Sequence, residues 1–249
     1  PLRSSSAASD VYKRQIQVLI TSVSYGRNLK KDQIRVQSNI ELFYLHPNHY
    51  EIPEKTNKSL PIKNNEDYVL LRFVTWEAYH DKGLSGFTDN NKIKVVNELK
   101  KHAQVFISAE GPLPESLEQY RIAISFEDMH DVIAKSKLFF GEGASMAAEA
   151  AVLGVPAIFL NDNWSGNANE LKEYELMYCY KSNKEDQELA ISKAIELVGL
   201  ESNEYHSAQR KKYLETKLDA SAFLCWFIEH YPESKLKISE EKAYLNTFV

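Results

Sequence analysis

The sequence predicts an α/β fold with a doubly wound, Rossmann-like parallel sheet. From residue 68 onward, short apolar and β-rich runs alternate with segments of helical periodicity. The runs are apolar at most positions, as is typical of strands buried between two helix layers. A glycine-rich turn at residues 141–143 lies where one such run ends and a helix begins. Because parallel crossovers are right-handed, these elements place helices on both faces of one sheet.

The elements follow one another in a regular order. We expect strands at 68–73, 104–108, 137–141, 155–161 and 176–180, and helices at 91–102, 126–135, 145–153 and 186–198. Beyond residue 198 the pattern is helical only, at 203–218 and again at 220–231. Pro232 ends the second of these helices, because its ring disfavours helical geometry in the preceding residue.

The chain before residue 68 predicts a different organisation. Two short β-rich runs, 16–22 and 39–45, are followed by His46-Pro47-Asn48 and a polar stretch, which is typical of a domain end and a hinge. Residues 1–15 lack periodicity and resemble translated sequencing-adapter read-through, which indicates an artefactual leader on a gene fragment. We therefore expect four parts: the leader 1–15, a remnant of an N-terminal domain with a hinge at 16–60, the Rossmann-like domain with C-terminal helices at 61–232, and a tail at 233–249.

Composition argues against several classes of function. The net charge of −5 disfavours a nucleic-acid-binding protein, which would carry clustered Lys and Arg. Cys179 and Cys225 are far apart without metal-ligand spacing, which indicates reduced thiols. No apolar run approaches the length of about 18 residues that a membrane span needs, and no signal-peptide pattern is present. We expect a cytoplasmic protein with no nucleic-acid partner, no membrane span, no metal and no cofactor.

The candidate site is the run from Gly141 to Pro156. Its glycines let a ligand approach the backbone, and the first amides of the following helix attract phosphate oxygens. Ser145 adds a hydroxyl, and Glu149, four residues later, lies on the same helix face, where a carboxylate suits a diol. Met146 stands where a dinucleotide fingerprint has its third glycine, which argues against an NAD site. Alternatively, the alanines of this helix only permit close packing, and Glu149 is a solvated helix residue.

These residues resemble a known motif. Gly143-Ala144, Glu149 and Leu153-Gly154-Val155-Pro156 are similar to the donor-site motif of the GT-B superfamily. That superfamily includes UDP-N-acetylglucosamine 2-epimerase and the N-acetylglucosaminyltransferase of peptidoglycan synthesis. The chain also resembles the domain-of-unknown-function family 354, which is thought to adopt this fold. The matching stretches lie between Leu42 and Tyr231, at 42–47, 71–73, 78–83, 105–110, 127–131 and 141–156.

The resemblance implies the C-terminal half of a GT-B fold with a nucleotide-sugar site. In that reading, Glu149 holds the ribose hydroxyls of the ligand. The turn at Gly143 leads to Ala144 and Ser145, whose backbone amides meet the diphosphate. Residues 126–127, Phe126 and Glu127, fall in the loop that contacts the uracil in the transferase.

Other residues are weaker candidates. Arg72 is the only obvious counterpart of the His-Arg-Arg-Glu-Asn motif of the epimerases, and it belongs to the expected nucleotide-sugar site. His80 and Lys82 follow the same predicted strand, where such side chains either meet phosphate or are simply solvated. His130 lies near a helix start between two aspartates, where both a structural hydrogen bond and proton transfer are open.

The predicted function is a nucleotide-sugar-binding domain, with a UDP-sugar as ligand, of a GT-B type glycosyltransferase-like protein. Two alternatives are a non-hydrolysing UDP-sugar 2-epimerase and a module that binds a nucleotide-sugar without catalysis. Because catalysis in such proteins takes place between two domains, the expected partner is a missing N-terminal domain of the same protein. We expect this fragment alone to be inactive, and no catalytic residue is assigned.

Overall fold

The computed structural model of the protein describes residues 18–27, 33–52, 60–62, 66–76 and 86–249. These fall into two units: a large one of residues 41–215, and a small one that joins the segment up to Ile40 with residues 216–249. The two units divide at residues 40 and 215, and the four-part organisation with boundaries at 15, 60 and 232 stays a prediction. Leu42 and Leu45 are fully buried in the core of the large unit, while the Leu218 amide donates to Gln37 O within the small unit.

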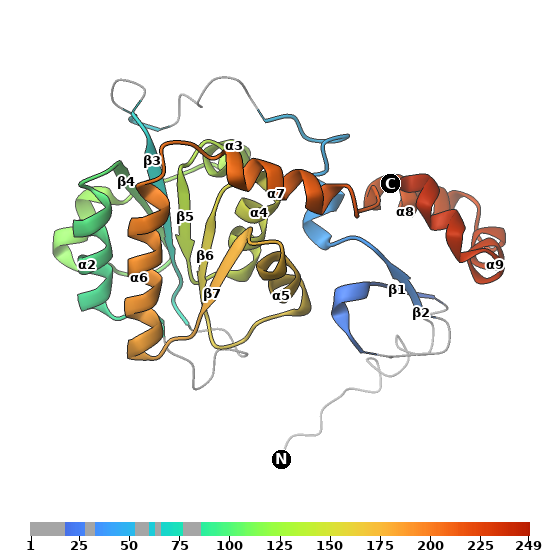
Figure 1. The fold of residues 1–249 in the computed structure, drawn as a ribbon, viewed down its shortest axis with the longest axis horizontal. Coiled ribbons are helices and arrows are strands. Elements are labelled where there is room, and N and C mark those ends of the chain that lie inside the picture. Colours follow the sequence, from blue (N-terminus) through green and yellow to red (C-terminus); the bar gives the residue numbers. More distant parts are fainter. Residues whose placement is uncertain (1–17, 28–32, 53–59, 63–65, 77–85) are drawn as a thin grey trace, which may run out of the picture. The chain divides into compact units, whose positions relative to one another are not determined.

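The large unit is built on a five-stranded parallel sheet, which confirms the predicted fold class (Figure 1). Its strands are β3 (Tyr68–Phe73), β4 (Gln104–Ala109), β5 (Leu138–Gly141), β6 (Ala157–Leu160) and β7 (Met177–Tyr180). They lie in the order β4-β3-β5-β6-β7. The chain therefore moves to one side of β3 for β4 and to the other side for β5 and its successors. This reversal makes β3 and β5 the topological switch point of a doubly wound fold.

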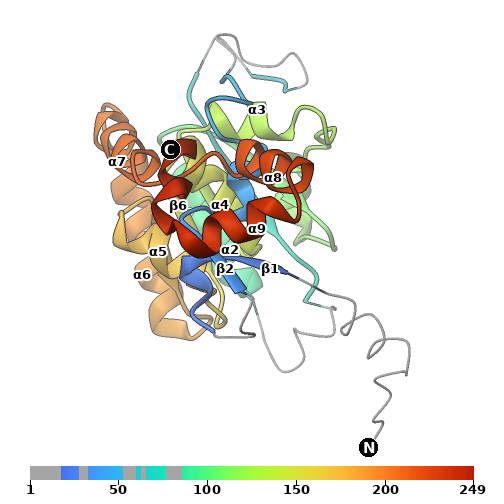
Figure 2. The ribbon, with the colours of Figure 1, turned by 90° about the vertical axis from the view of Figure 1, so that its right-hand side faces the viewer.

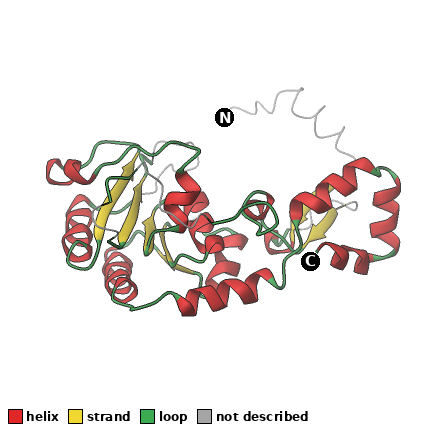
Figure 3. Cartoon of the chain, turned by 90° about the horizontal axis from the view of Figure 1, so that it is seen from above, coloured by secondary structure: helices red, strands yellow, loops and turns green. Residues whose placement is uncertain are grey.

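Helices cover both faces of this sheet (Figure 3). On one face, Val69 and Leu71 of β3 pack in a core with α2 (Asp89–Leu99) and α6 (Lys184–Val198). On the other face, Tyr68 and Leu70 pack in a core with α3 (Met129–Ala134), α4 (Ala144–Leu153) and α5 (Gly166–Glu173). Side chains of a strand point alternately to its two faces, so a run that is apolar at every position supplies both cores.

Local sequence explains where these helices begin and end. The side chains of Thr88, Ser165 and Asn183 accept hydrogen bonds from the first turns of α2, α5 and α6. Helix α4 ends at Gly154, which has a φ of 86°, in the left-handed region that favours glycine. The helix α7 (Glu204–Leu214) follows α6, and Arg210 of α7 donates from Nε to the Val152 carbonyl of α4 at 2.7 Å.

One sequence prediction about local structure is wrong, and several elements of the structure were not foreseen. Residues 39–45 form a 3-10 helix, η2 (Ile40–Phe43), rather than a strand, because Leu42 and Leu45 are buried at a spacing of three while Ile40 is exposed. The helices α5 and η4 (Glu115–Tyr120), and the strand β2 (Gln33–Val36), were not predicted. The expected tail folds as α9 (Glu233–Glu240) and η5 (Lys242–Phe248), and it buries Ser234 and Ile238.

The small unit contains a pair of parallel strands, β1 (Leu19–Ser22) and β2, with the short η1 (Val23–Tyr25) between them. Its helices are α8 (Ala220–Glu229), α9 and η5 (Figure 2). Aromatic rings join α8 to η5: Phe223 lies 5.6 Å from Phe248, and Trp226 lies 4.9 Å from Tyr244, centroid to centroid. No helix in the described part of the chain is long and apolar enough to cross a lipid bilayer.

Candidate functional site

The carboxyl ends of β3 and β5 lie side by side, because Arg72 of β3 is in register with Gly141 of β5. In open α/β sheets, ligands bind in the crevice outside the carboxyl ends of the strands at the switch point. The turn at Glu142-Gly143 leaves the sheet at this position and leads directly into α4. The fold therefore places the start of α4 where a ligand is expected.

The start of α4 brings together three of the predicted site residues. Gly143 is the N-cap, and Ala144 and Ser145 are exposed in the first turn. The first backbone hydrogen bond of the helix runs from Ala147 N to Gly143 O, so the amides of residues 144–146 precede it. The N-cap residue of this helix is a glycine and forms no side-chain cap, in contrast to the N-cap residues of α2, α5 and α6. Exposed amides at the positive end of the helix dipole attract anions.

Arg72 stands at the same edge of the sheet but already has partners. Its Nη1 donates to Ser108 Oγ at 2.7 Å, and its Nη2 donates to Glu110 Oε1 at 2.5 Å. Ser108 and Glu110 lie at the carboxyl end of β4, so this ion pair joins two adjacent strand ends. The Arg72 side chain is 21% exposed. A guanidinium has five N–H donors, so these two hydrogen bonds leave further donors for a phosphate at this edge.

Glu142 is a residue of this site that sequence reasoning missed. Its side chain is buried, and its two carboxylate oxygens accept from Val74 N at 2.9 Å and from Phe87 N at 2.5 Å. Burial raises the pKa of Glu142, and the two backbone donors oppose that shift. A Cβ at Gly86 would lie 2.2 Å from Glu142 Oε1, so glycine permits this close approach. Glu142 thus binds the backbone at both ends of the segment that connects β3 to α2, beside the start of α4.

Glu149 lies on α4, and its side chain is only 12% exposed. Tyr44 Oη donates to Glu149 Oε1 at 2.9 Å, and His130 Nε2 of α3 lies 3.5 Å from the same oxygen. The ring of His130 stacks on that of Tyr44 with centroids 5.3 Å apart. The alternative of a solvated helix residue is therefore wrong for Glu149. The alternative for the alanines of α4 was that they permit close packing. The structure agrees with it, because Ala147, Ala150 and Ala151 are fully buried against the sheet.

Phe126 and Glu127 are both exposed in the loop that leads into α3. Phe126 is 96% exposed, the largest value among the exposed large apolar side chains. In the sequence, Phe126 precedes His130 by four residues and Glu127 precedes it by three, and His130 contacts Glu149. A stacking partner would bury the free ring of Phe126. His80 and Lys82 lie outside the described residues.

The signal that could have found Tyr44 is weak. It belongs to the stretch 42–47, which the resemblance covers, but nothing in its local pattern points to α4.

His46 and His49 have ring centroids 6.2 Å apart. The part of the chain that the structure describes holds no group of three or more His, Cys, Asp or Glu side chains arranged to bind a metal.

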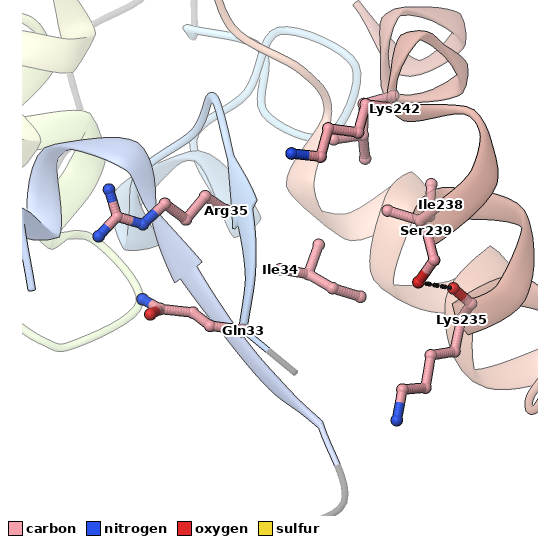
Figure 4. A pocket seen from close by; sticks show the side chains of 8 residues that line it. Gln33, Ile34, Arg35, Lys235, Ile238, Ser239 and Lys242 are labelled. Carbon is pink, nitrogen blue, oxygen red and sulfur yellow. Dashed lines mark hydrogen bonds between the residues drawn. The ribbon is translucent and has the colours of Figure 1, made fainter. Parts of the chain in front are cut away.

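The small unit contains a pocket of about 330 Å³ between β2 and the segment from α9 to η5. In Figure 4, Ile34 of β2 points toward α9, which carries Ile238. Ser239 Oγ donates to the Lys235 carbonyl at 2.9 Å in its wall. The pocket is lined by Gln33, Ile34, Arg35, Lys235, Ile238, Ser239, Lys242 and Leu245. None of the predicted site residues lines it.

No protein-family model matches this sequence, and no curated protein matches it. Solved structures with a similar arrangement include a protein assigned as a UDP-N-acetylglucosamine 2-epimerase from Listeria monocytogenes, at 16% identity over 72% of this chain and 46% of that chain, with a TM-score of 0.47. The calicheamicin glycosyltransferase CalG4 has 15% identity over 91% of this chain and 56% of its own, with a TM-score of 0.47. The spinosyn forosaminyltransferase SpnP has 13% identity over 92% of this chain and 55% of its own, with a TM-score of 0.47. This chain spans about half the length of these proteins. A shared fold does not identify a reaction.

Proposed function

We propose that the large unit binds a nucleotide-sugar, with UDP as its nucleotide, and that it is the donor-binding half of a GT-B type glycosyltransferase-like protein. The observation that carries the proposal is the start of α4. It is exposed, its N-cap residue is a glycine that forms no side-chain cap, and it lies at the switch point of the sheet. A carboxylate, Glu149, lies on the same helix, four residues after Ser145.

Each part of the ligand would meet a different part of this site. The diphosphate would accept hydrogen bonds from the amides of residues 144–146 and from the Ser145 hydroxyl. The ribose hydroxyls would donate to the Glu149 carboxylate. Phe126 would stack on the base with its exposed ring, and Glu127 would contact the edge of the base.

The epimerase alternative receives no support from Arg72, the one residue that matches the epimerase motif. Its guanidinium is already paired with Glu110 and Ser108. We retain glycosyl transfer as the proposed reaction of the whole protein. Its partner would be an N-terminal domain that supplies the acceptor site, and the cytoplasm is its proposed location.

Calorimetric titration of UDP into the full chain and into Glu149→Ala tests this proposal. A hydrogen bond to a charged group contributes about 1.5–3 kcal/mol. At about 1.4 kcal/mol per tenfold, the loss of one such bond weakens UDP binding by about tenfold to 150-fold, and the loss of two by about 150-fold to 20,000-fold. Alanine favours helix at least as well as glutamate, so α4 is expected to persist in the variant.

Glu173→Ala is the matched control, because it removes an exposed carboxylate from α5. We expect it to bind UDP as the wild type does. Equal dissociation constants for wild type and Glu149→Ala would contradict the role of Glu149. Failure of the wild type to bind UDP, with the helical signal and melting transition intact, would contradict the nucleotide-sugar site as a whole.

A further inference from the structure

The segment of residues 41–50 brings a tyrosine hydroxyl onto α4. Leu42 and Leu45 are fully buried and anchor the segment in the core of the large unit. Glu41 is also buried, and its carboxylate accepts from Asn167 Nδ2 of α5 at 2.8 Å. Tyr44, between the two leucines, is 39% exposed and turns toward α4 instead. The segment is therefore held in place on both sides of Tyr44.

Tyr44 and His130 constrain one oxygen of the Glu149 carboxylate. The Tyr44 hydroxyl donates to Oε1 at 2.9 Å, and His130 Nε2 lies 3.5 Å from that same atom. Burial, followed by the charge of Glu149, raises the pKa of Tyr44, so its hydroxyl remains a donor at neutral pH. Within the described residues, Oε2 of Glu149 makes no hydrogen bond. The carboxylate thus has one oxygen fixed by the protein and one open for another donor.

We propose that Tyr44 is a positioning residue for ligand recognition: it holds Glu149 Oε1 so that Oε2 receives a ribose hydroxyl of the nucleotide. This inference rests on the proposed function. A glutamate that is already immobilised loses less conformational entropy when the ligand binds. The hydrogen bond from Tyr44 therefore strengthens recognition of the ribose without touching the nucleotide itself.

Tyr50 offers a matched control in the same segment. Its hydroxyl donates to Asp131 Oδ1 of α3 at 2.6 Å, and its ring meets that of His130 edge-on at 6.1 Å. Tyr50→Phe removes one hydroxyl and one hydrogen bond to a carboxylate, as Tyr44→Phe does. The carboxylate concerned is not that of Glu149. A general loosening of residues 41–50 would affect both variants, whereas a change in the orientation of Glu149 would affect only Tyr44→Phe.

The test measures the dissociation constants of UDP and 2′-deoxy-UDP for the full-length wild type, Tyr44→Phe, Tyr50→Phe and Glu149→Ala. We expect the preference for UDP to fall by about two- to tenfold in Tyr44→Phe, the range that corresponds to immobilising one rotamer-rich side chain. We expect Tyr50→Phe to keep the wild-type preference, and Glu149→Ala to lose it.

Each contrary outcome has a distinct meaning. If Glu149→Ala loses the preference and Tyr44→Phe keeps it, the positioning role of Tyr44 is overturned while the proposed function stands. An equal loss in Tyr44→Phe and Tyr50→Phe would also overturn it, because general loosening would then account for the effect. If the wild type does not bind UDP, the proposed function itself fails. If Glu149→Ala binds both nucleotides as the wild type does, the role of Glu149 is contradicted, and the positioning role of Tyr44 fails with it.

Discussion

Replacing Glu142 with alanine removes the acceptor of two backbone amides that flank the connection between β3 and α2. Val74 N and Phe87 N both donate to this carboxylate, which is 1% exposed. A buried donor without a partner costs about 1–3 kcal/mol, so two of them destabilise the fold by about 2–6 kcal/mol. The alanine variant no longer buries a carboxylate, and the removal of this desolvation cost offsets part of the loss. We therefore expect a value in the lower half of the range. Glu142→Gln retains one acceptor oxygen, and we expect its loss of unfolding free energy to be about half that of Glu142→Ala.

Urea denaturation of wild type, Glu142→Ala and Glu142→Gln measures this effect. A stability change appears as a shift of the unfolding midpoint at an unchanged slope against urea. The order of stability is expected to be wild type, then Glu142→Gln, then Glu142→Ala. If the alanine variant unfolds at the wild-type midpoint, water solvates the two amides in the folded state, and the reasoning fails.

The pH dependence of the same variants gives an independent measurement. Burial raises the pKa of Glu142 above its ordinary value of 4.5, so the folded state holds this proton more tightly than the unfolded state does. The contribution of this group to stability is therefore fully present below pH 4.5 and declines as the pH rises through the folded pKa. The stability of wild type minus that of Glu142→Gln is expected to decrease over that window. An increase over the same window would show that the two backbone donors outweigh burial.

Two further predictions concern packing and thiol chemistry. Gly154→Ala is expected to lower the unfolding free energy by about 1–2 kcal/mol, because φ is 86° and the new Cβ would lie 2.8 Å from Arg210 Cδ; an unchanged melting temperature would contradict this. Cys225 is exposed, whereas burial hides Cys179 and raises its pKa to about 11, so a thiol reagent should label one cysteine per native chain at neutral pH. Rapid labelling of both cysteines in the folded protein would refute the buried position of Cys179.

The sequence alone determined the class of fold and the position of the candidate helix. The runs at 68–73, 104–108 and 176–180 coincide closely with β3, β4 and β7, because buried parallel strands are apolar on both faces and stand out from their surroundings. The start of α4 was predicted within one residue, since glycine marks the turn after β5. Local pattern was less informative for residues 39–45, where two buried leucines gave an apolar run that folds as a 3-10 helix.

Only the tertiary structure decided which side chains meet. The sheet order sets β3 beside both β4 and β5, and it thereby joins Arg72 to Glu110 and brings Glu142 to the amides of Val74 and Phe87. Tyr44 and Glu149 are 105 residues apart, and their contact depends on how residues 41–50 pack against α4. Periodicity in a sequence reports which face of each element is buried. It does not report which element covers that face, and for this reason the partners of Arg72, Glu142 and Glu149 emerged only from the folded chain.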